Sequence, residues 1–94
     1  MKTLINSVTT VEDYIEFLTS KGFSFGEDAL GFISFGQHYT STTDEVVNVA
    51  LEITLKAQKE FDGSFFVSLL EMFKEQKVST RKSALELAQY RNII

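Results

Sequence analysis

His38 is the only histidine in the chain, and histidine is the side chain best suited to proton transfer or metal binding near neutral pH. It lies in the segment GQHYT, where Tyr39 is the only neighbouring residue that could act with it. Zinc sites normally combine histidine with cysteine or with further histidines, and the chain has no cysteine. We therefore interpret His38 as a partly exposed side chain, and we expect neither a metal nor a cofactor.

Acidic side chains form three short clusters that could supply paired carboxylates for general acid–base catalysis. The clusters are Glu12, Asp13 and Glu16; Glu27 and Asp28; and Asp44 and Glu45. Each cluster stands where a helix is predicted to begin or a loop to turn, and acidic groups stabilise both kinds of structure. No nucleophile–base pair, glycine-rich phosphate loop or metal-ligand spacing accompanies them. The sequence therefore predicts a protein that is not an enzyme.

Basic side chains gather around the predicted junction of two C-terminal helices. They are Lys74, Lys77, Arg81 and Lys82. Arg81 and Lys82 would stand in the first turn of the last helix, where the macrodipole disfavours each cation by about 0.3–1 kcal/mol. With the free N–H groups of that turn they could bind a phosphate or an acidic surface. The other interpretation is a solvated helix end that tolerates a small penalty.

The same two helices have a limited similarity in spacing to a helix-turn-helix, in which Arg81, Lys82, Ser83 and Gln89 would face a DNA groove. However, Lys77 stands where glycine is usual in the turn. The isoelectric point of about 4.9 is also much lower than is normal for a nucleic-acid-binding domain. A nucleic-acid-binding regulator that uses residues 64–92 is therefore our alternative hypothesis.

Length and composition predict one globular domain, residues 1–94, because 44% of the residues are hydrophobic and 23% are charged. No apolar run approaches the ~18 residues of a membrane span, and no signal-like segment opens the chain. We therefore expect a cytoplasmic protein that does not bind membranes. Charge is uneven: residues 1–55 carry two basic and eight acidic groups, whereas residues 56–94 carry seven basic and five acidic groups. An acidic first half suits a basic partner.

Residues 46–57 decide the fold class, because every second residue is apolar. The apolar positions are Val47, Val49, Leu51, Ile53, Leu55 and Ala57. A competing helical stripe runs through Val46, Ala50, Ile53, Ala57 and Phe61. It leaves Val47, Leu51 and Leu55 on the opposite side, while alternation leaves only Ala50 out of place. Alternation and the β-branched residues predict a strand.

Residues 23–40 can be interpreted in two ways. The near-repeat of GFSFG and GFISFG resembles two short strands, whereas Ser24 and Glu27 have the spacing of a helix capping box. Gly31 and Gly36 would each cost a helix about 1 kcal/mol, so strands are favoured. Residues 41–45 then connect a hairpin.

Helices are predicted on both sides of these strands. In the segment TTVEDYIEFLTSKG, Thr9 and Glu12 have the spacing of a capping box, and Gly22 marks the C-terminal end. In DGSFFVSLLEMFKEQK, Asp62 or Ser64 can cap a helix whose apolar stripe runs from Phe66 to Phe73, and STRKSALELAQYRNII also carries apolar residues at helical spacing. The predicted fold class is α+β: an N-terminal helix, a three-stranded antiparallel sheet over about 23–26, 31–40 and 46–57, and two C-terminal helices packed on one face.

Because the sequence shows no combination of catalytic residues, we expect a small acidic, non-catalytic protein that binds another protein as an inhibitor, an immunity-type antagonist or a regulatory adaptor. The acidic contact residues would be Glu12, Asp13, Glu16, Glu27 and Asp28, and the apolar ones Phe32, Phe35 and Tyr39. A nuclease or another nucleic-acid enzyme would be a suitable basic partner. The exposed edges of the hairpin could also pair with a second copy of the chain, giving a homodimer.

Overall fold

The computed structural model describes residues 9–94 and contains five helices. They are α1 (Val11–Ser20), α2 (Glu27–Thr40), α3 (Asp44–Gln58), α4 (Gly63–Glu75) and α5 (Arg81–Tyr90). Within this described part no residue belongs to a β-strand, so the predicted α+β class and its three-stranded sheet are wrong. Residues 31–40 lie within α2, residues 46–57 lie within α3, and residues 23–26 belong to the α1–α2 connection.

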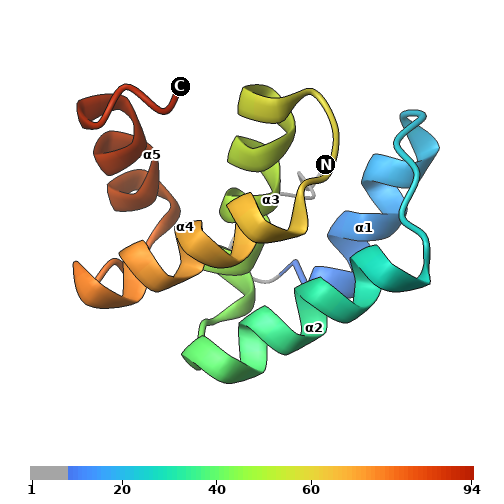
Figure 1. Ribbon diagram of the computed structural model, residues 1–94, viewed down its shortest axis with the longest axis horizontal. Helices are drawn as coiled ribbons and strands as arrows, with labels where there is room; N and C mark the ends of the chain where they lie inside the picture. The colour runs from blue at the N-terminus through green and yellow to red at the C-terminus, as the bar shows by residue number, and fades with distance from the viewer. Residues whose placement is uncertain (1–8) are drawn as a thin grey trace.

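The central position of α3 explains why its sequence resembles a strand. α3 contacts α1, α2, α4 and α5, and most of its side chains are buried (Figure 1). The buried set is Val46, Val47, Asn48, Val49, Ala50, Leu51, Ile53, Thr54 and Leu55. A helix buried on nearly every side lacks the polar stripe that gives surface helices their 3.6-residue period. Apolar residues can then alternate along the chain without forming a strand.

In α2 the two glycines do not prevent a helix, because one of them permits close packing. A Cβ atom at Gly36 would lie 3.1 Å from Leu70 Cδ1 and 3.2 Å from Phe66 Cε2, so glycine lets α2 approach α4 closely. Tertiary packing of this kind outweighs the propensity cost that favoured strands from sequence. Glu27 and Asp28 occupy the first turn, and Ser41 ends the helix in the left-handed conformation with φ 55°.

The predicted helices at the two ends of the fold are confirmed. Thr10 caps α1 by accepting a hydrogen bond from the N–H of Asp13 at 3.0 Å, one residue later than the Thr9 capping expected from sequence. Gly22 follows α1 with φ +104°. Asp62 caps α4 by accepting from the N–H of Phe65 at 3.0 Å, and Thr80 caps α5.

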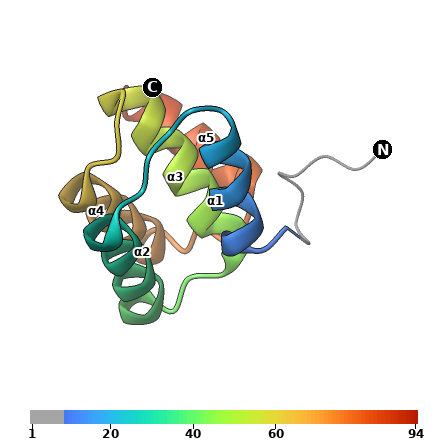
Figure 2. The ribbon, with the colours of Figure 1, turned by 90° about the vertical axis from the view of Figure 1, so that its right-hand side faces the viewer.

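α2 and α4 lie side by side and run in the same direction (Figures 1 and 2). Near the start of both helices the ring of Phe32 lies over Gly63, and near their ends Tyr39 and Thr40 share a groove with Glu71 and Lys74. α1 and α5 pack mainly on α3, and Arg91 at the end of α5 reaches Met72 of α4. The fold therefore consists of a central α3, a parallel α2–α4 pair, and a junction of α3 with α1 and α5.

Candidate functional site

Three aromatic side chains on the outer side of α2 remain in contact with water. Phe32 is 45% exposed, Phe35 57% and Tyr39 60%. Their spacing of three and four residues places them in one row along the helix, and Phe35 stacks on Tyr39 with ring centroids 5.4 Å apart. We call Phe32, Phe35 and Tyr39 the aromatic ridge. These are the residues predicted as an apolar contact surface, although they stand on a helix and not on a hairpin.

The aromatic ridge is fixed to the fold at its first residue. A Cβ atom at Gly63 would lie 2.6 Å from the Phe32 ring, so the ring rests directly on the backbone at the start of α4. The adjacent face of α2 is buried through Ile33, Gly36 and Thr40. Because α2 is held on that face, the ridge is presented by a rigid element.

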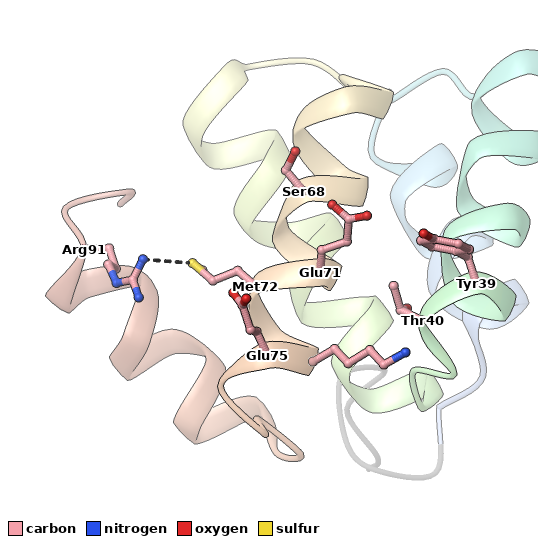
Figure 3. Close-up of a pocket in the computed structure, with 8 residues that line it drawn as sticks. Tyr39, Thr40, Ser68, Glu71, Met72, Glu75 and Arg91 are labelled. Atoms are coloured by element: carbon pink, nitrogen blue, oxygen red, sulfur yellow. Dashed lines mark hydrogen bonds between the residues drawn. The ribbon is translucent and has the colours of Figure 1, made fainter.

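An open groove of about 890 Å³ lies beside the last residue of the ridge (Figure 3). Its lining residues come from α2, α4 and the end of α5: Tyr39, Thr40, Ser68, Glu71, Met72, Lys74, Glu75 and Arg91. Tyr39 and Glu71 stand on facing walls, and Arg91 Nη1 donates to the sulfur of Met72 at 3.6 Å. The two carboxylates and the two cations of the groove balance, so it has no net preference for either sign of charge.

Acidic side chains stand at the other end of the ridge. Glu27 and Asp28 line a shallow depression of about 430 Å³ together with Gly31, Phe32 and Phe35. The structure therefore brings two of the predicted acidic residues next to the predicted apolar ones. Glu12, Asp13 and Glu16 are exposed on α1 and do not line this depression.

The predicted basic cluster is divided by the structure. Lys74 and Lys77 lie beside the connection that follows α2, where they line a depression of about 290 Å³ with Thr40 and Thr43. Lys82 is exposed in the first turn of α5. Arg81 instead lies against α3, where its partly buried guanidinium donates two hydrogen bonds to the carboxylate of Glu52.

The first turn of α5 already holds a carboxylate. The backbone N–H of Arg81 donates to Glu45 Oε2 at 2.9 Å. This internal contact uses one of the N–H groups that, from sequence, were candidates for binding an external phosphate. Glu45 thereby links the start of α3 to the start of α5.

A polar cluster joins α1, α3 and α5. Glu52 accepts from Arg81 and lies 3.8 Å from Lys56 Nζ. The hydrogen bond from Glu52 raises the pKa of Arg81 above its usual value. Burial, and then the negative charge of Glu52, raise the pKa of Tyr14 to about 12. Sequence reasoning missed Tyr14 and Glu52; a lone carboxylate among the apolar residues of 46–57 was the signal that could have indicated an internal ion pair.

Asp44 and Asn48 fasten the start of α1 to α3. Asp44 Oδ2 accepts from the N–H of Val11 at 3.0 Å, and its Oδ1 accepts from Gln37 Nε2 at 2.8 Å. Asn48 Nδ2 donates to the carbonyl of Thr9 at 3.1 Å. Asp44, expected from sequence to serve a loop, therefore joins α1, α2 and α3.

His38 is exposed near the end of α2, and its Nδ1 lies 2.9 Å from the carbonyl oxygen of Ser34 on the preceding turn. Across residues 9–94, no group of three or more His, Asp or Glu side chains is arranged to hold a metal ion. In the same part of the chain, none of the helices combines the length and the apolar character that crossing a bilayer requires.

Comparison with known proteins places the chain in a family. A family described as "Family of unknown function (DUF6123)" matches residues 6–94. The chain belongs to the DUF6123 family. Neither the curated proteins nor the solved structures contain a match to the chain. The DUF6123 description states no activity or partner.

Proposed function

We propose that the protein is non-catalytic and acts by binding another polypeptide through the outer side of α2, as an inhibitor, an immunity-type antagonist or a regulatory adaptor. The observation that carries this proposal is the exposure of Phe32, Phe35 and Tyr39 in one row on a rigid helix. Soluble proteins rarely leave large apolar side chains together in water unless another surface covers them.

The energetics of the ridge favour a protein partner. Full burial of a large apolar side chain contributes roughly 1.5–3 kcal/mol, and each ridge residue has about half of its surface still to bury. Aromatic side chains also dominate the central, tightly packed part of protein interfaces. Three such residues on one helix give a small but sufficient core for an interface.

The charge beside the ridge indicates the chemistry of that partner. Glu27 and Asp28 stand next to Phe32 and Phe35. Acidic groups at the edge of an apolar contact attract basic surfaces and set their orientation. We therefore propose a partner surface that combines apolar side chains with lysine or arginine.

Several groups that could do chemistry are already engaged inside the fold, which supports a non-catalytic role. The carboxylates of Asp44, Glu45 and Glu52 each accept internal hydrogen bonds. The exposed His38 contacts a backbone carbonyl of its own helix.

A photo-crosslinking amino acid at position 35 tests the proposal in cells of the native host. We expect a covalent adduct between the Phe35 variant and one polypeptide, because an interface centred on the ridge brings the partner to this side chain. The same amino acid at exposed Glu86 on α5 is the control and should give no such adduct. Absence of any polypeptide adduct from positions 35 and 39, in a folded protein, would overturn the proposal.

The alternative, a nucleic-acid-binding regulator that uses residues 64–92, has less support. Arg81, which was expected to face a groove, donates its side-chain hydrogen bonds to Glu52. A gel-shift titration separates the two proposals: salt-sensitive binding that disappears in Lys77→Ala/Lys82→Ala would favour the nucleic-acid function.

A further inference from the structure

The surface that carries the aromatic ridge is formed by the parallel helices α2 and α4, and its two ends differ in charge. At the start of the pair stand Glu27 and Asp28, without a basic side chain in their depression. Beyond the end of α2, Lys74 and Lys77 line a depression without an acidic side chain. Lys74 also borders the neighbouring groove, where Glu71 and Glu75 are balanced by Lys74 and Arg91, so Lys77 gives this end its excess of positive charge. The ridge lies between these ends, so one surface carries an acidic end, an apolar middle and a basic end.

Such a surface is complementary to its own copy when the copy is turned end to end. A two-fold axis through the middle of the ridge would set α2 of one protomer antiparallel to α2 of the other. Glu27 and Asp28 of each protomer would then face Lys74 and Lys77 of its partner, twice by symmetry. The antiparallel arrangement also brings each helix N-terminus toward the partner's C-terminus, which is the favourable orientation of the macrodipoles.

The shape of the surface fits the same arrangement. The ridge projects from α2, and beside its last residue lies the open groove between α2 and α4, which Ser68 lines together with Tyr39. In an antiparallel pair the ridge of each protomer meets this groove of the other. The basic complement that the proposed function requires is thus present on the chain itself.

We infer that the partner of the aromatic ridge is a second copy of the chain, bound as a two-fold symmetric dimer with antiparallel α2 helices. The inference rests on the proposed function, because it uses the same surface and names its occupant. Helices of 14 and 13 residues are each about 20 Å long and about 10 Å wide. The resulting footprint of about 20 by 20 Å is that of a small interface, so we expect a dissociation constant in the micromolar range.

Sedimentation of the purified full-length protein from about 5 to 500 μM gives the first test. We expect the mass to rise from that of the 10.6 kDa monomer to that of a dimer. Phe35→Ala should weaken dimerisation by roughly tenfold or more, because it removes the central aromatic group. Tyr90→Ala, which removes an aromatic side chain that is 83% exposed on α5, is the matched control and should dimerise like the wild type. Circular dichroism verifies that each variant is folded.

Charge reversal tests the orientation. Glu27→Lys/Asp28→Lys and Lys74→Glu/Lys77→Glu should each be monomeric alone, because like charges then face each other at both ends of the dimer. An equimolar mixture should form a heterodimer, in which both pairs of ends are again opposite in charge. Added salt should weaken this heterodimer. Orientation is tested by the combined variant Glu27→Lys/Asp28→Lys/Lys74→Glu/Lys77→Glu, which should dimerise with itself when the α2 helices are antiparallel, because opposite charges again face each other. In a parallel arrangement this variant would set like charges against each other at both ends.

A wild type that stays monomeric over the whole range overturns the dimer, as does a dimer insensitive to Phe35→Ala or a mixture that forms no heterodimer. The photo-crosslinking result distinguishes failure of the dimer from failure of the proposed function. An adduct at position 35 with a different protein, from a chain that is monomeric, would keep the proposed function and remove the dimer. No adduct with any polypeptide would remove both.

Discussion

Two stacked aromatic pairs in this protein have opposite surroundings. Tyr14 and Phe17 on α1 have ring centroids 6.1 Å apart, and Phe35 and Tyr39 on α2 have theirs 5.4 Å apart. Tyr14 is 3% exposed and packs into the junction of α1, α3 and α5, whereas Tyr39 is 60% exposed. At the junction neighbouring helices cover the Tyr14 side chain, and Arg81 pairs with Glu52. On α2 the same residue types remain more than half exposed, with Phe35 at 57% and Tyr39 at 60%. The first pair therefore contributes to the packing of the fold, whereas the second leaves a large apolar surface in contact with water.

Truncation of one phenylalanine in the core and one on the ridge should give the largest difference in the free energy of unfolding. Phe66 is fully buried in the core, and Phe66→Ala should lower the free energy of unfolding by about 3–5 kcal/mol through lost burial and a cavity. Phe35→Ala should lower it by less than about 1 kcal/mol, because that side chain is more than half exposed. Urea unfolding at a concentration where the protein is monomeric measures both. Equal losses would mean that the ridge is part of the core.

Tyr14 makes the junction sensitive to alkaline pH. Its pKa is raised to about 12, while the unfolded chain loses this proton near 10. The folded protein keeps the proton longer, so stability is fully present below pH 10 and falls as the pH rises toward 12, by about 2–3 kcal/mol in total.

Urea unfolding between pH 8 and 12 measures this loss. Tyr14→Phe should remove that part of the pH dependence, and Tyr39→Phe, which takes a hydroxyl from the ridge, is the matched control. The assignment fails when both variants follow the same pH profile.

Replacement of Glu52 should lower the free energy of unfolding more than replacement of its exposed neighbour Lys56. Glu52→Gln leaves Arg81 without its carboxylate, and we expect a loss of about 1–2 kcal/mol because the pair is only partly exposed. Lys56→Ala should cost less than about 0.5 kcal/mol, since its side chain is 61% exposed. A double-mutant cycle of Glu52→Gln with Arg81→Gln gives the coupling directly; zero coupling would show that the ion pair does not stabilise the junction.

Glycine substitutions in α2 should give the smallest effects and opposite signs on its two sides. Gly31→Ala meets no atom within 4 Å and should stabilise the helix by about 0.5–1 kcal/mol. Gly36→Ala brings a methyl group to 3.1 Å from Leu70 Cδ1, which should cancel that gain or reverse it. Thermal unfolding at matched concentrations compares the two. An equal gain at both positions would show that the α2–α4 contact is less tight than described.

The parts of the fold that could be predicted from sequence are those with local signals. Asp62, Gly22 and the apolar stripe of residues 66–73 mark helices by capping and spacing, which act within a few residues. The identity of α2 and α3 depends on what surrounds them. Gly36 is acceptable in a helix because α4 lies against it, and the alternation in residues 46–57 is acceptable because four helices enclose α3. Neither condition is visible before the chain is folded.

The candidate surface could be predicted in part for the same reason. Phe32, Phe35 and Tyr39 share a face at helical spacing, and Glu27 and Asp28 precede them, so they remain neighbours on the folded chain. Arg81 could not be placed from sequence, because its partners Glu45 and Glu52 stand 36 and 29 residues away. Long-range pairing of this kind leaves no local pattern.

The enclosure of α3 also has a consequence for the time scale on which parts of the molecule open. Val47, Ala50, Leu51 and Ile53 have no exposed surface, so the backbone amides around them meet solvent only when the surrounding helices separate. Hydrogen–deuterium exchange at the centre of α3 therefore reports opening of the whole domain. Amide exchange along the water-facing edge of α2 should be faster, and it should become slower when the protein self-associates. The exchange rates of α2 and α3 can therefore be compared within the same molecule.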